Sequence, residues 1–461
     1  MRFAMLPSVT ELSKLEAAEE LEAVSFPHAA GSHVSIREQM HLRSLTITGN
    51  ADSRLERGRV DVGTSDVSPT PERFQWSNNV SIGLLSSVVV MFLAASAAPT
   101  PLYATYAAAW HFTPITVTMI FGIYAIAVLV SLLTVGSLSD YVGRKPVLIV
   151  ATLVQAATTI LFITASSATD LIVARIIQGL ATGAAAAAVG AALIDLDKTK
   201  GAIANAVSPM MGSATGGLIS GLLVQFLPLP TVLVYAVIGV LLLGMTIALR
   251  FVPETSSPRS GALASLRPHF RLPVEARKPL LIAIPALVAA WALAGFYFSI
   301  GQGLVKALLN TKAVAPGGVV LFMLAGSGAL TVLLNHKRSA RELMLLGSSL
   351  LIVGVAITIV AFELRVPVLL FVGAVVAGGG FGASFQGAIR SVVPLAQPHE
   401  RAGLLSVVYV IAYLAMGVPA VIGGIRVVHG GGLWLTAREY GVAVIVLATV
   451  ALVGTLRTKR D

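Results

Sequence analysis

The chain of 461 residues has no cysteine and few charged side chains, and both shortages narrow the class of protein. Without cysteine there is no disulfide framework, thiol nucleophile or thiolate metal site. Only 12% of the residues are charged and 56% are hydrophobic, whereas a soluble domain carries roughly 25% charged residues. The composition therefore excludes an ordinary soluble enzyme and favours many membrane spans of about 20 apolar residues each.

Motifs for catalysis and nucleotide binding are also missing. The sequence has no P-loop and no His-Glu-x-x-His motif, which are the usual signatures of nucleotide and zinc chemistry. After the first 75 residues, no carboxylate falls in the middle of an apolar run. We therefore expect neither an enzyme nor a cofactor or metal site. ATP-driven transport would need a nucleotide-binding subunit encoded elsewhere.

The net charge of +10 is unevenly distributed along the chain. Residues 1–75 hold 8 Lys/Arg and 11 Asp/Glu, and the remainder holds 24 Lys/Arg and 11 Asp/Glu. The positive charges of the remainder lie in short gaps between apolar runs, which is typical of membrane orientation rather than of a nucleic-acid surface. We expect the lipid bilayer, and no nucleic acid, as a partner.

The first 77 residues are polar and show weak hydrophobic periodicity. They contain no apolar core of the kind found in a signal peptide. We interpret residues 1–77 as a polar, largely disordered cytoplasmic tail. An over-extended gene start explains the segment equally well.

Twelve apolar runs of membrane-span length follow from residue 80 onward. Runs of about 20 residues can satisfy their backbone in a bilayer only as helices, so the sequence predicts an all-α polytopic membrane protein. The longest polar gap divides these runs six and six. We expect an N-terminal six-helix bundle over residues 78–252, a basic cytoplasmic linker over 253–278, and a C-terminal six-helix bundle over 279–461.

The Lys/Arg counts of the gaps predict the orientation. Eighteen of these residues fall in the gaps on the side of the chain termini, and five fall in the opposite gaps. Because Lys and Arg are enriched on the cytoplasmic side, both termini are expected in the cytoplasm. We predict a multi-pass protein of the cytoplasmic (inner) membrane.

The strongest local motif is the loop of residues 136–145, between the second and third runs. Gly136 and Asp140 are four residues apart and share a helix face, while Gly143 suits a tight turn. Asp140 ends its helix, where the helix dipole disfavours an anion. It should therefore have a specific partner, either Arg144 or the N-terminus of another helix.

A second motif lies inside the fourth run, where Arg175 precedes Gln178 and Gly179. An arginine within the membrane is expensive and usually faces a cavity or a partner. The alternative is that Arg175 extends to the outer membrane interface.

Together these features resemble the major facilitator superfamily of secondary transporters. The loop matches the family's signature at Gly136, Leu138, Asp140, Gly143, Arg144 and Lys145. The resemblance implies that the acid and the arginine latch the two halves in one state of the transport cycle. It also implies a role in proton coupling for Arg175, Gln178 and Gly179. The glycines of the fifth run match the drug-antiporter motif imperfectly, because Gly217 stands where that motif has proline, and helix packing explains them as well.

Aromatic and amide side chains near the middle of the runs are candidates for a substrate cavity. In the seventh run, Trp291, Phe298 and Gln302 recur at helical spacing and form one stripe. A cavity of such groups suits a partly apolar solute, although each could instead pack against lipid or a neighbouring helix. The candidates are Tyr124, Trp291, Tyr297, Phe298, Gln302, Gln386, Tyr409 and Tyr413. We expect Tyr103, Tyr106 and Trp110 to be interfacial anchors.

The sequence thus predicts a secondary active transporter that moves a small organic solute by alternating access. Proton-coupled export by an antiporter is the first interpretation, with protons as the coupling ion and a monomeric protein. An importer or uniporter of a small metabolite is the alternative. A protein of another class, a non-transporting membrane receptor or scaffold on the same fold, also remains open.

Overall fold

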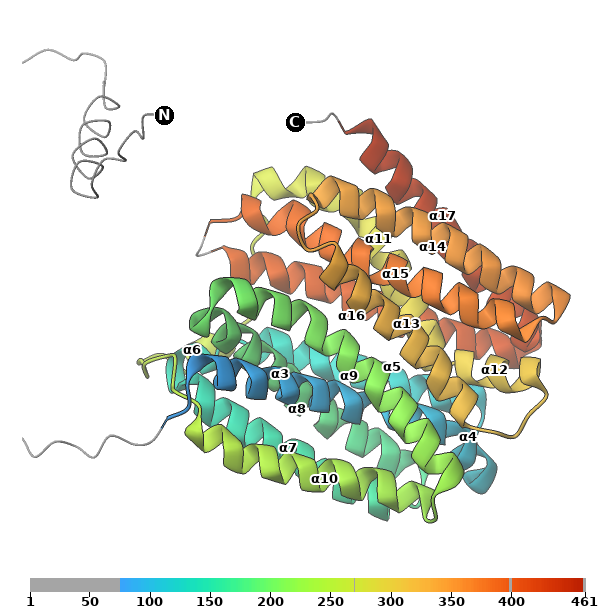
Figure 1. The fold of residues 1–461 in the computed structure, drawn as a ribbon, viewed down its shortest axis with the longest axis horizontal. Helices are drawn as coiled ribbons and strands as arrows, with labels where there is room; N and C mark the ends of the chain where they lie inside the picture. Colours follow the sequence, from blue (N-terminus) through green and yellow to red (C-terminus); the bar gives the residue numbers. More distant parts are fainter. Residues whose placement is uncertain (1–74, 269, 398–399, 459–461) are drawn as a thin grey trace, which may run out of the picture. The chain divides into compact units, whose positions relative to one another are not determined.

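The computed structural model describes residues 75–268, 270–397 and 400–458. These residues are helical and contain no β-strand (Figure 1). The polar tail predicted over residues 1–77 lies almost entirely outside them.

The membrane-length helices follow one another with short connections. In chain order the long helices are α3 (Asn78–Ala97) with α4 (Pro99–Trp110), α5 (Pro114–Thr134), α7 (Arg144–Thr164), α8 (Ala168–Leu196), α9 (Lys198–Phe226), α10 (Pro230–Ala248), α11 (Val274–Phe298), α13 (Ala315–Leu334), α14 (Ala340–Leu364), α15 (Pro367–Val392), α16 (Arg401–Arg426) and α17 (Gly432–Arg457). Short helical turns complete the set: α6 (Ser139–Val142), η1 (Leu249–Phe251), η2 (Ala264–Leu266), α12 (Gly301–Leu309), η3 (Val393–Leu395) and η4 (Val427–Gly431).

Eleven helical stretches of the described residues are long and apolar enough to cross a membrane. The last of them spans 57 residues and is interrupted by non-helical backbone at His429 and Gly430. This break separates α16 from α17, and each of these two helices has 26 residues. The described residues therefore contain eleven to twelve helices of membrane-spanning length, in agreement with the number of apolar runs.

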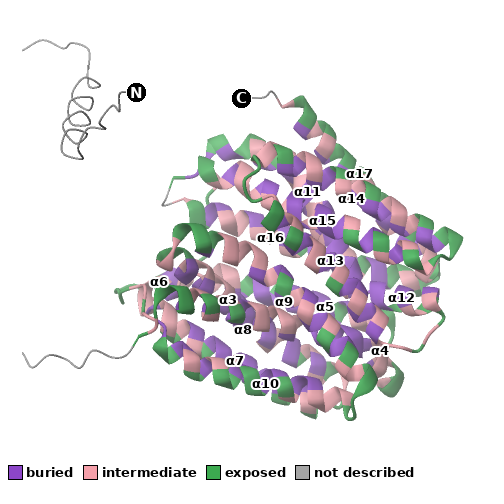
Figure 2. Ribbon diagram, in the orientation of Figure 1, coloured by how far each residue is buried: buried purple, intermediate pink, exposed green. Residues whose placement is uncertain are grey.

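Large apolar side chains on the outer faces are exposed. Val240 and Ile247 of α10 are 69% and 63% exposed, and Ile160 of α7 is 61% exposed. Figure 2 shows these outer helix faces in green and the faces toward neighbouring helices in purple. Exposed apolar surface on this scale fits a lipid environment, in which such faces need no cover.

Helix packing occurs mostly within two parts of the chain, from α3 to α10 and from α11 to α17. In the first part of the chain α5 packs on α8, α3 on α9, and α7 on both α8 and α10. In the second part α14 packs on α15 and α17, and α11 on α15, α16 and α17. Two long pairs join the parts, namely α9 with α13 and α5 with α16.

The glycines of α9 allow two of these contacts to be close. Gly212 and Gly216 face α3, where a Cβ on Gly216 would collide with the backbone of Ala94. Gly217 and Gly221 face α13, where a Cβ on Gly221 would lie 3.3 Å from the Cα of Gly318. Small residues let helices approach closely in membranes, so these glycines form two packing stripes.

Substitution of Gly216 by alanine is expected to destabilise the protein by about 1–3 kcal/mol, the usual cost of overpacking. The added methyl group would have to displace the backbone of α3. Gly244 of α10 is the matched control, because a Cβ there meets nothing within 4 Å. Thermal unfolding of the two alanine variants in detergent checks the prediction, and equal stability of both would contradict it.

Candidate functional site

Arg175 is buried inside the helices rather than extended to a membrane interface. It follows the first residue of α8, Ala168, by seven positions, or roughly 10 Å along the helix axis. Its side chain is 1% exposed. The guanidinium donates to the hydroxyl of Tyr103 from Nε at 3.0 Å, to the carbonyl of Ser96 at 2.8 Å, and to Oε1 of Gln178 at 2.7 Å. Arg175 is therefore held by buried partners and does not extend to the outer membrane interface, which was the alternative left open by the sequence.

The carbonyl acceptors arise from a break in the first span. Pro99 has no N–H, so the carbonyl of Ala95 loses the donor that an unbroken helix would supply four residues later. The break separates α3 from α4. Gln178 of α8 donates from Nε2 to the Ala95 carbonyl at 3.2 Å, and Ser220 of α9 donates to the Ala98 carbonyl at 2.6 Å. Side chains of later helices thus satisfy the broken backbone.

Aromatic rings surround the guanidinium. The Arg175 Cζ atom lies 5.6 Å from the ring centre of Tyr103, 5.1 Å from that of Tyr124 and 5.9 Å from that of Phe162. Such contacts stabilise a cation that has lost its water shell. Within the described ranges, no ion pair joins Arg175 to a carboxylate. The site therefore holds a buried positive charge with neutral partners.

Gly179 brings Tyr124 to this site. A Cβ on Gly179 would lie 2.8 Å from the carbonyl of Tyr124 and 2.6 Å from the Cβ of Ala127, both on α5. Glycine is therefore required for the close approach of α5 to α8.

The interpretation of Tyr103 and Tyr106 as interfacial anchors is wrong. Tyr103 is 2% and Tyr106 is 3% exposed. Tyr103 binds Arg175, and the hydroxyl of Tyr106 donates to that of Tyr235 at 3.4 Å. Trp110 is half-buried and stacks on Tyr106, with 4.8 Å between ring centres. The need of a buried guanidinium for partners draws Tyr103 inward.

The signature loop is built around an ion pair between Asp140 and Arg144. Arg144 also donates to Ser139 Oγ at 2.8 Å and lies 3.4 Å from a carboxylate oxygen of Asp195 at the end of α8. Gly143 has a φ of 101°, which a residue with a side chain rarely adopts. This turn separates α6 from α7 and places Arg144 beside both acids.

Three further residues of the loop lie against helices of the first part of the chain. A Cβ on Gly136 would lie 3.6 Å from the Cβ of Ala187 on α8, and Leu138 is half-buried at the start of α6. Lys145 donates from Nζ to the carbonyls of Arg250 and Val252, at 3.0 Å for Val252. Lys145 thereby binds the end of the sixth span.

Glu254 completes the loop from the start of the polar gap. Its carboxylate accepts from the backbone N–H groups of Arg144 at 2.8 Å and of Lys145 at 3.0 Å. A carboxylate at this place caps the N-terminus of α7 and complements its dipole. Neither Glu254 nor Asp195 was among the site residues predicted from the sequence. The nearest signal was that Glu254 is the first acid after the sixth run.

Residues of the polar gap also cover the loop. The hydroxyl of Ser256 donates to the Asp140 carbonyl at 3.2 Å, and the backbone N–H of Arg259 donates to the Tyr141 carbonyl at 2.8 Å. Ser137 Oγ donates to the Ser265 carbonyl at 2.8 Å. Among the residues that the structure describes, neither Asp140 nor Arg144 is bonded to α16.

Two pairs of helices, α5 with α16 and α9 with α13, make the main contacts between the two parts of the chain. Near the end of α16, Gly424 packs on Thr118 of α5 and Val421 on Gly122. In the other pair, the side chain of Gln225 near the end of α9 accepts from the backbone N–H of Ala315 at the start of α13, at 2.8 Å. The contacts of α5 with α16 therefore lie in the halves of these helices away from the signature loop, whereas α9 and α13 pack along most of their length, as far as Met210 and Val332.

An aromatic cluster occupies the surface where the two parts meet. The ring of Trp291 on α11 lies 5.9 Å from Phe381, 5.4 Å from Phe385 and 5.3 Å from Tyr413. Tyr413 lies 6.4 Å from Tyr409. The indole N–H of Trp291 is buried and has no hydrogen-bond partner in the described part of the chain. The cluster combines apolar rings with one unused donor.

Residues of the first part of the chain complete this cluster. Phe298 stacks on Phe121 of α5 with 6.4 Å between ring centres. Trp291, Phe298 and Tyr413 pack against the buried cluster of Phe121, Ala125, Met416 and Ala420. Phe385 also packs against the buried cluster formed by Met210 of α9 with Ala329 and Val332 of α13.

Four of the candidate residues are therefore brought together, namely Trp291, Phe298, Tyr409 and Tyr413. Gln386 follows Phe385 on α15 and is half-buried, and Tyr124 lies with Arg175 instead. The sequence analysis missed Phe381 and Phe385, although their spacing of four residues beside Gln386 was a usable signal.

Tyr297 and Gln302 lie elsewhere. Tyr297 is 1% exposed, and its hydroxyl lies 3.2 Å from Thr358 Oγ1 in the core of the second part. Gln302 lies on α12 and donates to the Tyr297 carbonyl at 3.3 Å. The predicted stripe assumed one unbroken helix, but α11 ends at Phe298 and α12 begins at Gly301.

The described residues contain no group of three or more histidine, aspartate or glutamate side chains that could hold a metal ion. The chemistry of both sites is instead that of a buried cation and of aromatic packing. Neither arrangement resembles a hydrolytic or redox centre.

Comparison with known proteins places this geometry in a family. A family model, described as Major Facilitator Superfamily, matches residues 84–362, which is more than half of the chain. The chain belongs to the Major Facilitator Superfamily. It is thus a multi-pass membrane protein of a transporter family and not an enzyme. No curated protein matches the sequence.

Solved structures of the same superfamily share the fold. A point mutant of the nucleoside transporter NupG aligns with a TM-score of 0.65 and 13% identity, over 82% of this chain and 100% of that chain. A second NupG structure aligns with a TM-score of 0.61 and 12% identity, over 83% of this chain and 100% of that chain. At this level of identity the similarity concerns the fold alone.

Proposed function

We propose that this superfamily member is a secondary transporter that moves a small, partly apolar organic solute across the cytoplasmic membrane. Residues 78–252 and 279–461 would form two six-helix bundles, joined by the basic linker of residues 253–278. Both termini would be cytoplasmic, as the excess of Lys and Arg on their side favours. The protein would work as a monomer.

One observation carries this proposal. The contacts of α5 with α16 lie in the halves of these helices away from the signature loop, while Asp140 and Arg144 are bonded within the first group. A signature loop that is not bonded to α16 fits one end state of alternating access, in which the bundles rock about a site between them. In the other state the signature loop would bind the second bundle and act as the latch.

The aromatic cluster around Trp291 supports the choice of solute. Its rings come from α11, α15 and α16 and pack beside α5 and α9, so both bundles border it. Flat apolar solutes stack on such rings, and the free indole N–H could bind an acceptor atom. Nucleosides combine a flat base with acceptor atoms, and NupG is a nucleoside transporter.

In this proposal Arg175 would couple transport to protons. Export coupled to protons would use the buried cation to favour proton release from a solute or a water molecule nearby. Import and uniport remain the rivals.

Flux into proteoliposomes tests the proposal. Purified protein in sealed vesicles should exchange radiolabelled uridine or adenosine at a rate well above that of empty vesicles. A pH gradient, with and without a protonophore, reports coupling, and loading of one side at a time reports direction. Absence of flux for nucleosides, other flat metabolites and amphipathic drugs would favour a receptor or scaffold instead.

Substitution of Trp291 by alanine is expected to weaken solute binding by about tenfold or more, because stacking on one aromatic ring contributes roughly 1–3 kcal/mol. Trp291→Phe keeps a ring and removes the N–H, so it should retain part of the affinity. Trp434, which lies under Arg365 with 3.9 Å between Cζ and the ring centre, provides the control as Trp434→Ala. Titration by thermal shift measures all three, and unchanged affinity in Trp291→Ala would remove the cluster from the binding site.

A further inference from the structure

A shallow groove runs along the last turns of α17, on the outer surface of the helices. It has a volume of about 350 Å³ and is lined by Thr449, Val450, Val453, Gly454 and Arg457. Val450 is 53% exposed and Val453 is 39% exposed. In a membrane-spanning helix such faces contact lipid, so the groove opens toward the bilayer and not toward the aromatic cluster.

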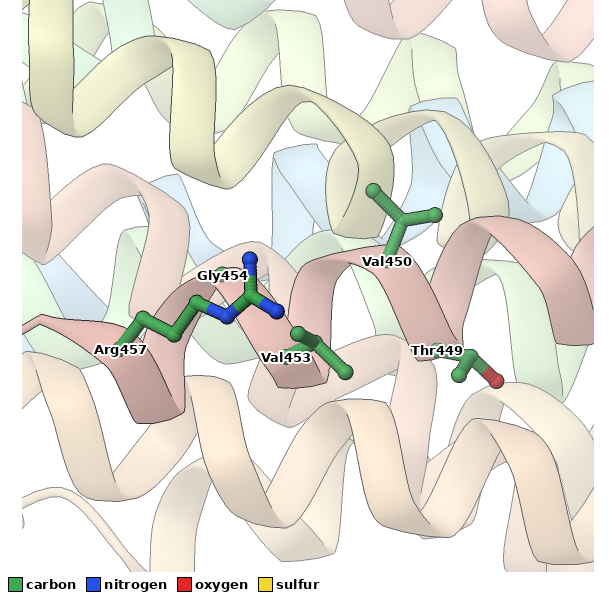
Figure 3. Close-up of a pocket in the computed structure, with 5 residues that line it drawn as sticks. All are labelled: Thr449, Val450, Val453, Gly454 and Arg457. Atoms are coloured by element: carbon green, nitrogen blue, oxygen red, sulfur yellow. The ribbon is translucent and has the colours of Figure 1, made fainter.

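Gly454 forms the floor of the groove. A Cβ at this position would lie 3.5 Å from a methyl carbon of Ile282 on α11, so α11 stands beside the groove. Figure 3 shows the Arg457 side chain lying over Gly454 and pointing back along α17, away from the helix end. Helical side chains point toward the N-terminus of their helix, and the missing side chain of Gly454 leaves room for the guanidinium.

The Arg457 side chain is exposed at the end of α17. It makes no hydrogen bond or ion pair with any residue in the described ranges. α11 begins on the same side, and Lys278 lies one helical turn before Ile282, so a second cation stands at a similar depth. Glu275 lies about one turn closer to the start of α11 than Lys278. In the sequence Lys459 and Arg460 follow Arg457 after Thr458, and Asp461 comes next.

We propose that this groove binds one anionic phospholipid. The phosphate would accept from the Arg457 guanidinium, and part of one acyl chain would lie along Val450 and Val453. Basic residues at the cytoplasmic ends of helices attract anionic lipids, and a volume of about 350 Å³ admits part of a chain but no whole lipid. The inference depends on α17 crossing the membrane with Arg457 at the proposed cytoplasmic side, and it is independent of the transported solute.

Native mass spectrometry of the detergent-purified protein tests the site. Dioleoyl-phosphatidylglycerol should be retained more strongly than dioleoyl-phosphatidylcholine. Arg457→Gln should weaken retention of the anionic lipid by about fivefold, the effect of one basic residue near an anionic surface. Gly454→Leu keeps every charge and fills the groove, so it should also weaken retention.

Lys337→Gln is the matched control. Lys337 is an exposed cation of the loop between α13 and α14, on the same predicted side and outside the groove, so its loss should leave retention unchanged. Equal retention in Arg457→Gln and the unmodified protein would overturn the proposal. So would equal retention of the two lipids, or full competition by glycerol 3-phosphate, which has the phosphate and no acyl chain.

Discussion

Replacement of Arg175 by alanine is expected to abolish transport that depends on pH, with a loss of flux of at least about a hundredfold. The substitution removes a buried charge together with donors to Tyr103, Ser96 and Gln178. A charge in a dry site acts over a longer range than one in water, so its removal should alter the proton affinity of any group in the solute pathway. Flux in proteoliposomes between pH 5.5 and 8 measures the effect.

Arg175→Lys separates the charge from the hydrogen bonds. Lysine keeps the positive charge but lacks the planar fork that reaches several acceptors at once. If the charge alone matters, this variant should retain a pH-dependent flux at a reduced rate. Gln178→Leu leaves the charge but removes the donor to the Ala95 carbonyl and one acceptor of the Arg175 guanidinium, so it tests the hydrogen bonds. An unchanged pH profile in Arg175→Ala would remove Arg175 from coupling.

Asp140→Asn should leave folding and membrane insertion intact and still reduce transport by about tenfold or more. The side chain of Asp140 is 50% exposed, and exposed ion pairs contribute only about 0–1 kcal/mol to stability. Transport should suffer because the same carboxylate is proposed to bind the second bundle in the opposite state. Size-exclusion chromatography checks folding, and initial rates of flux check transport.

Asp195→Asn is the matched control for this prediction. Asp195 also faces Arg144, at 3.4 Å, but it belongs to α8 and has no proposed partner in the second bundle. A latch that depends on Asp140 should therefore be affected much less by Asp195→Asn. If Asp140→Asn transports at the same rate as the unmodified protein, the latch hypothesis is contradicted.

The approximate number and positions of the spans could be predicted from the sequence because each one is a continuous apolar run. Arg175 and the loop of residues 136–145 were identifiable for a related reason, since charge is rare next to apolar runs and therefore conspicuous. The internal breaks of helices were harder to predict. The sequence is equally apolar on both sides of Pro99. No change to polar residues marks the end of α11 at Phe298.

Contacts between distant segments explain the remaining errors. Tyr103 has the composition expected of an interfacial residue, and only the position of Arg175, 72 residues later, decides that it is buried. Tyr297 shares a run with Trp291, but the rotation of α11 turns it toward Thr358. Such choices depend on which helices become neighbours, and the periodicity of one run contains no information about that.

The proline break in the first span also has a consequence for biogenesis. A broken helix in lipid leaves carbonyl groups unsatisfied, at a cost of several kcal/mol each. The donors that satisfy them belong to Gln178 and to Ser220, which lies 122 residues after its acceptor. At a synthesis rate of about 5–20 residues per second, Ser220 follows Ala98 out of the ribosome by about 6 to 24 seconds. During that interval the first span would have to remain beside water or the insertion machinery, and its final shape would be set only when the fifth span arrives.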